Sequence, residues 1–366
     1  MHIVPLMTPE AFYANALNQI TELGPARLCK LREYAGNFEY AWKLSTNDLT
    51  EILQDPALAE TISTARVAVD PGAAWQALEK AGIYTYTRSD PAYPSDLHNI
   101  PTPPEVLYAR GGLPKKDTLA IAIVGTRKPT AYGLEACATL AEDLARAGCT
   151  IISGLARGID TKAHEACLKA NGTTIAVLGS GMHDSVLYPA VNRQLATRIM
   201  TQNGTLISEY PLTMHAQPWT FPQRNRIVAG LADGILVIEA QEKSGALITA
   251  RFGLETGKDI FAVPGQIFSL ASVGPHALIK EGAALVATAR DILDTYGITY
   301  QGIETPTYEN LPEGAADILT ALTEPKHRDQ IARETGKSAE DTNRLISLLE
   351  VHAMIKHVGQ GVYRKV

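Results

Sequence analysis

The sequence of 366 residues has few of the features that mark membrane, secreted or metal-binding proteins. No apolar run approaches the roughly 20 residues that a membrane-spanning helix needs. The first ten residues, MHIVPLMTPE, lack the basic and then apolar pattern of a secretory signal peptide. The four cysteines show no CxxC spacing, so we expect buried free thiols in a reducing compartment. These absences predict a cytoplasmic protein without membrane contact.

Positive charge is also scarce. The 33 Lys and Arg are outnumbered by 39 Asp and Glu, which gives a formal net charge of −6. A surface coated with basic residues is therefore excluded, and any site for an anion must be local. With 45% hydrophobic and 20% charged residues, the chain can bury a large core, and its length suffices for two or three domains.

Two common nucleotide-binding signatures are missing. The GxGxxG turn does not follow the first predicted strand of the central region, and no acidic residue ends the second, which argues against a nicotinamide dinucleotide site. The P-loop pattern GxxxxGK[ST] does not occur. His183 and Asp184 are adjacent, but no third metal ligand stands at a suitable spacing. We therefore expect neither a cofactor nor a metal.

The N-terminal part is helical in pattern. Residues 1–75 place apolar side chains three and four positions apart, between Gly, Pro and Asn, and predict a helical domain of the SAM or helix-hairpin-helix kind. Its stretch LGPARLCKL could form a DNA-contacting hairpin, but the glycines are incomplete and we favour a plain docking module. Residues 76–116 are rich in proline and predict an ordered connector laid over the next domain.

The central part, residues 117–297, alternates short β-branched runs with helical segments. Because the strands are apolar throughout, this alternation predicts an α/β domain with a doubly wound, mainly parallel sheet covered on both faces. The predicted strands are 119–125, 150–154, 174–181, 205–211, 234–240, 259–265 and 284–287. The predicted helices are 131–147, 161–171, 190–202, 223–232, 245–257 and 275–281.

The C-terminal part follows a linker at 298–307. Residues 308–366 contain three amphipathic helical segments and then KHVGQGVYRKV, which reads as a hairpin, so the pattern predicts a winged helix. A DNA-reading winged helix favours basic residues at the start of its third helix, where this chain has Glu340 and Asp341. We favour a regulatory or protein-binding module and leave DNA binding open.

Ligands of doubly wound sheets gather beyond the carboxyl ends of the strands, where the loops enter helices. The sequence places glycines and cations there, in GTRKPTAYG (125–133), SGLARGID (153–160) and EKSGALITA (242–250). Glycine permits a sharp turn, and helix N-termini offer unpaired amides to an anion. The candidates for phosphate or DNA contact in these and the neighbouring loop are Arg127, Lys128, Ser153, Gly154, Arg157, Arg193, Ser244 and Gly245.

Asp160 and His164 are four positions apart and share a predicted helix face. The pair could suggest acid–base chemistry. We favour Asp160 as a helix N-cap, because Asp is a preferred residue at that position.

The stretch FPQRNRIVAG (221–230) sets two arginines beside apolar residues. Phe221 offers an aromatic face, Arg224 and Arg226 offer guanidinium forks for phosphate, and Asn225 can fix the turn or a base edge. Alternatively, one of the two arginines is buried against a carboxylate and only holds loops together. Arg226 is the favoured candidate for this role. The candidate carboxylates are Glu209 and Glu239.

Six blocks of the central region, in the same order, resemble the DNA-processing protein A family (DprA, also called Smf). They are VGTRKPTAYG, SGLARGIDTKAHEACL, GTTIAVLGSGMHDSVLYPAVNRQL, LISEYP, FPQRNRIVAGLADGILVIEA and EKSGALITARFGLETGKDIFAVPG. The resemblance implies an extended Rossmann-like fold, here with a C-terminal winged helix, that binds single-stranded DNA without catalysis. It further implies a homodimer that protects incoming DNA and loads the recombinase RecA during natural transformation.

Carried over by motif, the resemblance assigns DNA contact to Arg127, Ser153, Gly154, Phe221, Arg224, Asn225 and Arg226. Some relatives carry a lysine just before the phenylalanine, where this chain has Pro218, Trp219 and Thr220. Trp219 can stack on a base instead, a contact that every base can make.

An enzyme of related fold is the alternative. Phosphoribohydrolases that cleave nucleoside monophosphates carry PGGxGTxxE at the turn where this chain has EAQEKSGALITARFGLE. The double glycine and the glutamate at that spacing are both missing, so we favour the non-catalytic binder.

Overall fold

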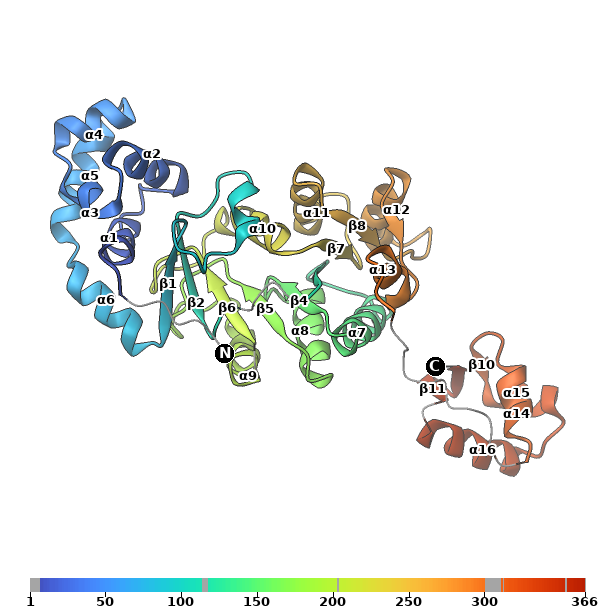
Figure 1. Ribbon diagram of the computed structural model, residues 1–366. Helices are drawn as coiled ribbons and strands as arrows, with labels where there is room; N and C mark the ends of the chain where they lie inside the picture. The colour runs from blue at the N-terminus through green and yellow to red at the C-terminus, as the bar shows by residue number, and fades with distance from the viewer. Residues whose placement is uncertain are drawn as a thin grey trace. The chain divides into compact units, whose positions relative to one another are not determined.

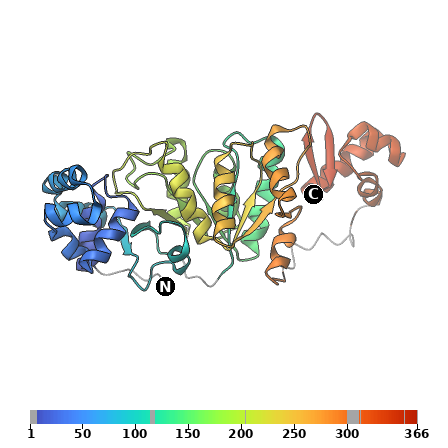
Figure 2. The same ribbon diagram turned by 90° about the horizontal axis from the view of Figure 1, so that it is seen from above.

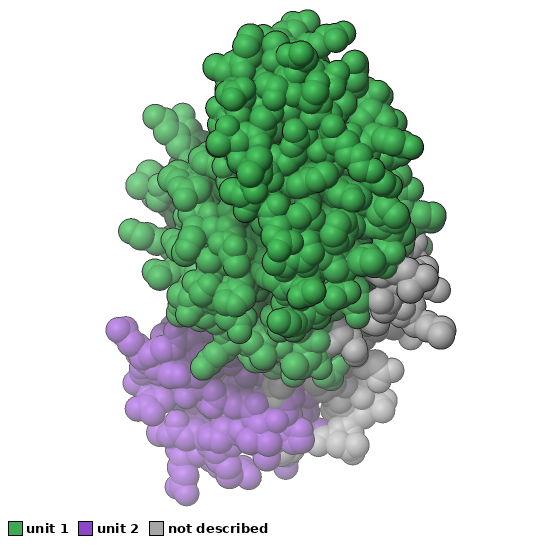
Figure 3. Space-filling model, turned by 90° about the vertical axis from the view of Figure 1, so that its left-hand side faces the viewer, with its two compact units in different colours: residues 1–300 green, residues 301–366 purple. Residues whose placement is uncertain are grey.

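The computed structural model describes residues 7–113, 118–202, 204–299, 311, 313–352 and 354–365. These form two compact units, Met1–Tyr300 and Gln301–Val366, coloured green and purple in Figure 3. Within the described ranges, no helix is long and apolar enough to cross a membrane.

The first unit begins with six short helices, which appear in blue in Figures 1 and 2 beside the end of the sheet that carries β1 and β2. Several start with proline at the first helical position, where its missing N–H costs nothing. Thr8, Asp55 and Asp70 cap these helices by accepting a backbone N–H. The six are α1 (Pro9–Asn18), α2 (Pro25–Ala35), α3 (Phe38–Lys43), α4 (Thr46–Leu53), α5 (Pro56–Ala68) and α6 (Pro71–Lys80).

A nine-stranded sheet forms the body of this unit, in the order β1-β2-β6-β5-β4-β3-β7-β8-β9. The pairs from β6 through to β9 are parallel, whereas β1 and β2 are antiparallel, which confirms the predicted fold class. The strands are β1 (Ile83–Thr87), β2 (Val106–Arg110), β3 (Ala120–Val124), β4 (Thr150–Ser153), β5 (Thr174–Val177), β6 (Thr205–Ser208), β7 (Gly234–Val237), β8 (Asp259–Ala262) and β9 (Ala284–Leu285).

Helices cover both faces of the sheet (Figure 1). One face packs against α7 (Ala131–Arg146), α8 (Ile159–Lys169), α9 (Arg193–Thr201) and α13 (Ala289–Thr295). The other packs against α10 (Thr220–Leu231), α11 (Gly245–Glu255) and α12 (Val273–Lys280). Short 3-10 turns are η1 (Ser95–Asn99), η2 (Ala190–Asn192) and η3 (Leu270–Ser272). Several strands end three residues earlier in the structure than the sequence predicted, because the last residues of those segments leave the sheet and form loops.

The segment 76–116 differs from the predicted connector. Within it, β1 and β2 join the sheet and pair with each other, and β2 also pairs with β6. Five of the prolines that suggested irregular structure lie in the loop between these two strands, where no ladder N–H is needed, and Pro114 lies outside the described residues. The five are Pro91, Pro94, Pro101, Pro103 and Pro104.

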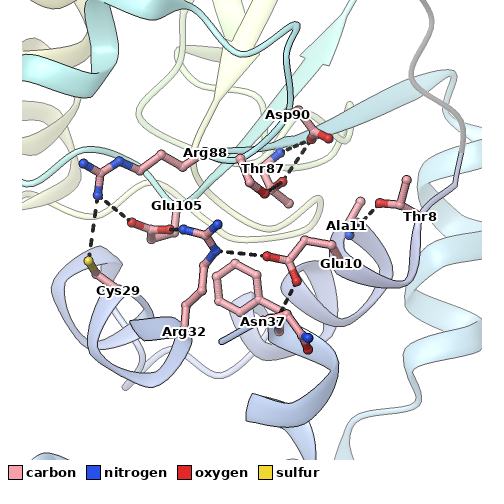
Figure 4. Close-up of polar contacts among 12 residues, drawn as sticks. Thr8, Glu10, Ala11, Cys29, Arg32, Asn37, Thr87, Arg88, Asp90 and Glu105 are labelled. Carbon is pink, nitrogen blue, oxygen red and sulfur yellow. Dashed lines mark hydrogen bonds and ion pairs between the residues drawn. The ribbon is translucent and has the colours of Figure 1, made fainter. Parts of the chain in front are cut away.

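A buried carboxylate fastens the helices to the sheet (Figure 4). Glu105, just before β2, binds Nη1 of Arg88 through Oε1 at 3.1 Å and lies 3.8 Å from Nη1 of Arg32 through Oε2. Arg32 belongs to α2 and also binds Glu10 of α1 at 3.0 Å. Glu105 is buried, so its negative charge would be costly without partners. Arg32 from the N-terminal helices and Arg88 from the loop after β1 balance that charge.

The second unit has three helices and the three-stranded antiparallel sheet β10-β12-β11, which agrees with the predicted helices and hairpin. Asp341 and Ser338 bind each other at the start of α16, so this acidic residue serves the helix terminus. The predicted linker lies outside the described residues from position 300 onward. The elements are α14 (Ala315–Ala321), β10 (Lys326–His327), α15 (Arg328–Thr335), α16 (Ala339–Val351), β11 (Ile355–Gly359) and β12 (Val362–Lys365).

Candidate functional site

A cavity of about 680 Å³ lies beyond the carboxyl ends of β3, β4 and β7. In the sheet β3 stands between β4 and β7, so the chain changes direction here, which is where open α/β sheets bind ligands. The lining comes from the loops after these strands and from the starts of α10 and α11. It includes Arg127, Lys128, Phe221, Arg224, Asn225 and Ser244.

Arg127 and Phe221 form a cation–π pair at the rim of this cavity. The guanidinium carbon of Arg127 is 5.2 Å from the centroid of the Phe221 ring, and the Arg127 side chain is exposed. The ring of Tyr188 lies 5.4 Å from that of Phe221 on the side of an adjoining cavity of about 310 Å³. Gly179 allows this packing, because a Cβ there would stand 2.9 Å from the Phe221 ring. The planes of the two rings are inclined at 50°, so the site presents two tilted aromatic rings next to a cation.

Arg224 lies at the base of the cavity and is almost fully buried. Its Nη1 donates to the carbonyls of Gly154, which directly follows β4, and of Val177, which ends β5, and its Nε donates to Oδ1 of Asn225 at 3.3 Å. Burial lowers the pKa of Arg224, and attraction to Asp160 opposes that shift. Arg224 is thus a fixed cation that holds two strand ends together, not a free arm at the surface.

Arg226 faces away from the cavity and binds Glu209. The two guanidinium nitrogens lie 2.9 and 2.6 Å from the carboxylate oxygens, and Nε donates to the carbonyl of Thr102 at 3.0 Å. Glu239 is instead the partner of Thr130 at the start of α7. Of the two hypotheses for the arginines, the structure therefore gives Arg226 the buried role, and its prediction as a phosphate contact is corrected.

Asp160 and His164 do not form an acid–base pair. The N-cap of α8 is Gly158, so the prediction that Asp160 caps this helix is wrong. Its Oδ2 accepts the amides of Gly154 and Ala156 at 3.1 and 3.3 Å and so shapes the turn after β4. His164 binds Thr174, and burial lowers its pKa to about 3, which keeps the ring neutral.

His183 and Asp184 do not approach each other as metal ligands. His183 bonds to Ser185 at 2.7 Å, and Asp184 is exposed 3.7 Å from Arg110. Among the residues that the structure describes, no group of three or more potential metal ligands gathers.

The remaining predicted residues separate into three sets. Lys128, Ser244 and Gly245 line the main cavity, and Arg157 lines the adjoining one. Ser244 caps α11, and the carbonyl of Gly245 accepts from Asn225 at 3.1 Å.

Three others lie elsewhere. Ser153 is buried and donates to the carbonyl of Ile123 at 2.7 Å, so its hydroxyl is committed to the sheet. Arg193 binds the carbonyl of Ser185 at 3.3 Å and lines neither cavity. Trp219 lines a different cavity, behind the first turn of α10.

Two residues that the sequence analysis did not single out also belong to the site. Lys243 lines the main cavity and Tyr188 the adjoining one. Lys243 could have been found beside Ser244 in EKSG, whereas Tyr188 had no signal beyond its Tyr-Pro step. Asp160 is the single carboxylate that the described residues contribute to the main lining, against four basic side chains. An acidic protein thus carries a locally basic cavity that suits an anion.

The chain is similar to known proteins over most of its length. The model of the DNA recombination-mediator protein A family matches residues 84–297. Protein Smf from Synechocystis sp. is 37% identical over 293 residues, which are 79% of this chain and 73% of that protein. The DNA processing protein DprA of Bacillus subtilis is 43% identical over 219 residues, which are 60% of this chain and 73% of that protein.

Solved structures agree with this likeness. The structure of DNA processing protein A from Streptococcus pneumoniae matches with a TM-score of 0.66 at 32% identity and covers 81% of this chain and 100% of that one. The protein of the same name from Helicobacter pylori, described with its single-stranded DNA binding mode, matches with a TM-score of 0.51 at 31% identity over 58% of this chain and 95% of that one. The chain therefore belongs to the DNA recombination-mediator protein A family.

Proposed function

We propose that the chain binds single-stranded DNA in the cavity at the ends of β3, β4 and β7. The observation that carries this proposal is the cluster of Arg127, Phe221 and Tyr188 at its rim, in which a cation and two aromatic rings contact one another. Proteins that bind single strands without sequence preference combine a cationic groove with aromatic side chains on which bases stack. The single-stranded DNA binding mode of the relative from Helicobacter pylori supports the same role here.

Phosphates would be held by cations at different depths. Arg127, Lys128 and Lys243 are exposed and can reach the backbone of the strand. Arg224 adds a buried positive charge beneath them, and Ser244 and Gly245 at the start of α11 line the same space. The site would thereby neutralise several phosphates without reading the base sequence.

We propose that the site is not catalytic. The carboxylate of Asp160 is occupied by backbone amides, and burial raises its pKa. His164, the nearest predicted base, binds Thr174 inside the core. Neither residue is placed to activate a water or a leaving group.

We further propose that the DNA complex protects incoming single strands and delivers RecA during natural transformation, as the family resemblance implies, and that the cytoplasmic protein is a homodimer. Support for self-association comes from the sheet edge at β9, where Leu285 is exposed, and from the loop after β8. In that loop Ile267 and Phe268 are 78% and 94% exposed. Apolar groups this open to water favour an interface.

Fluorescence anisotropy with labelled oligo-dT and with a duplex of the same length, each across a salt series, tests the proposal. We expect a strong preference for the single strand and a steep loss of affinity with salt, with a slope of roughly 0.7 per neutralised phosphate. Failure to bind the single strand at low salt would refute DNA binding, and turnover of nucleoside monophosphates would then be tested.

A further inference from the structure

A second cavity, of about 290 Å³, lies where the N-terminal helices meet the α/β body. One wall is the turn before α2, from Ile20 to Pro25, and another is the segment after β6, from Glu209 to Pro211. The start of α10 closes the third side through Trp219 and Gln223. Apart from the start of α10, the cavity is therefore built from parts of the chain that do not line the main one.

The first turn of α10 separates this cavity from the main one. Trp219 and Gln223 are one turn apart and line the second cavity, whereas Phe221 and Asn225 line the first. Trp219 and Phe221 are two residues apart, so their backbones are at most about 7 Å from each other. This is about two rises at the 3.4 Å per nucleotide of one strand of a duplex, and fewer for a single strand that is more extended. A strand in the main cavity can thus reach Trp219 by crossing a single helical turn.

Trp219 is exposed in a way that leaves a ring face open. Its side chain is 48% exposed, and it meets the ring of Tyr210 edge to face, with centroids 6.1 Å apart and planes at 78°. An edge contact orients the indole without covering both of its faces. The backbone of Gln223 is hydrogen-bonded to Trp219 and Arg226, whereas its exposed side-chain amide makes no hydrogen bond within the described chain and can contact the edge of a base.

The charges around this cavity favour a base over a phosphate. The carboxylate of Glu105 is balanced by Arg88 and Arg32, and that of Glu209 by Arg226. The walls between them are apolar, with Ile20, Leu23, Pro25 and Pro211. The lining also contains the carboxylate of Glu22, whose charge is offset by that of Arg27. Exposed Arg27 binds the backbone carbonyl of Glu22 and is the one cation that the described residues add to the lining. A neutral, largely apolar cleft beside an open indole matches the face of a nucleobase.

We propose that this second cavity takes a nucleobase of the same single strand, stacked on Trp219, after the strand has crossed the first turn of α10. The inference rests on the proposed DNA binding and extends it, because it makes the N-terminal helices part of the DNA-binding surface.

The test is an affinity series with oligo-dT from about 4 to about 16 nucleotides, the range of site sizes for such surfaces. Trp219→Ala should weaken binding of the longer oligonucleotides roughly fivefold to a hundredfold and leave that of the shortest unchanged. Trp219→Phe, which keeps an aromatic face, should restore most of the loss. Tyr34→Ala is the matched control, because Tyr34 is an exposed aromatic residue that lines neither cavity.

Tryptophan fluorescence gives an independent readout that a loss of folding would not imitate. The chain has three tryptophans, at positions 42, 75 and 219. In a Trp42→Phe/Trp75→Phe protein, long oligo-dT should quench the remaining emission, whereas Trp219→Phe protein should show little quenching. An abasic site moved along the oligonucleotide should lower affinity at one position near an end in the wild type, and the loss at that position should disappear in Trp219→Ala.

The outcomes distinguish this inference from the proposed function. If the wild type binds single strands and Trp219→Ala binds each length with the same affinity as the wild type, the second cavity takes no base. An equal loss at every length would place Trp219 inside the main site and overturn the inference. A change in oligomeric state without a change in DNA affinity would assign the cavity to a second copy of the chain. If the wild type does not bind single strands, the proposed function itself fails.

Discussion

Arg226 and Glu209 form a two-pronged ion pair whose side chains are only 6% and 5% exposed. Two positions earlier, Arg224 stands on the opposite side of the same helical turn, at the base of the cavity. The arginines look equivalent in the sequence, yet one holds the body of the protein together and the other sets the charge of the site.

Arg226→Ala should lower the free energy of unfolding by about 3–5 kcal/mol, because it leaves the Glu209 carboxylate buried without its partner. Urea unfolding followed by circular dichroism measures the loss. The double variant Arg226→Met/Glu209→Gln removes both charges and should recover part of the stability. A loss below about 1 kcal/mol for Arg226→Ala would show that water reaches the pair.

Arg127→Ala should weaken single-strand binding by about 1.5–3 kcal/mol at low salt, since a charge-assisted contact is lost. The slope of log affinity against log salt should fall by roughly 0.7. Anisotropy titrations at several salt concentrations measure both quantities. Arg193→Ala is the matched control, because Arg193 lines neither DNA cavity, and we expect its salt slope to equal that of the wild type.

Phe221→Leu should weaken binding by about 1–3 kcal/mol and leave the salt slope unchanged, because it removes a stacking face but no charge. Leucine retains apolar volume against Gly179 and Tyr188. Phe221→Tyr should bind like the wild type. A fall in the salt slope of Phe221→Leu would mean that the ring acts by positioning Arg127 rather than by stacking on a base.

Gly154→Ala should destabilise the protein by about 1–3 kcal/mol, because a Cβ there would overlap the guanidinium of Arg224. The same substitution should cost much less in an Arg224→Ala background, where that space is vacant. A double-mutant cycle on unfolding free energies measures this coupling. Strict additivity of the two substitutions would contradict the contact.

His164 should make stability fall as the pH drops below about 6.5. Burial lowers its pKa to about 3 in the folded protein, whereas the unfolded chain takes up a proton near its ordinary pKa of 6.5. The unfolded state is therefore favoured progressively between pH 6.5 and pH 3, by about 2 kcal/mol at pH 5. Unfolding of the wild type and of His164→Gln across this range isolates the contribution, and parallel curves would contradict it.

Much of the fold follows from local pattern. The parallel strands were visible because each is an apolar run between helices, and those in the middle of the sheet, β3 to β7, are buried on both faces. The antiparallel β1 and β2 were not visible, because the prolines of the loop between them outweighed two five-residue strands. Where a strand ends was also hidden, since residues that leave the sheet at the site remain apolar and buried, as Leu178 and Ile238 do.

The site was predictable only as a set of loops. Motif and charge identified Arg127, Lys128 and Ser244, which do meet in one cavity. The partner of a buried arginine depends on which strand ends lie near it, and this is decided by the order of strands in the sheet. The direction in which Trp219 points is set by one helical turn, and a linear sequence gives no sign that it faces away from Phe221.

The guanidinium of Arg224 joins the ends of β4 and β5 through hydrogen bonds to carbonyl groups of the protein itself. The position of this guanidinium is thus fixed when the protein folds, and an anion that binds does not have to order it. A ligand then loses less affinity to the ordering of its site, and it meets an electric field that does not have to reorganise. The base of the cavity therefore carries a fixed positive charge, and only the side chains at the rim have to adapt to the ligand.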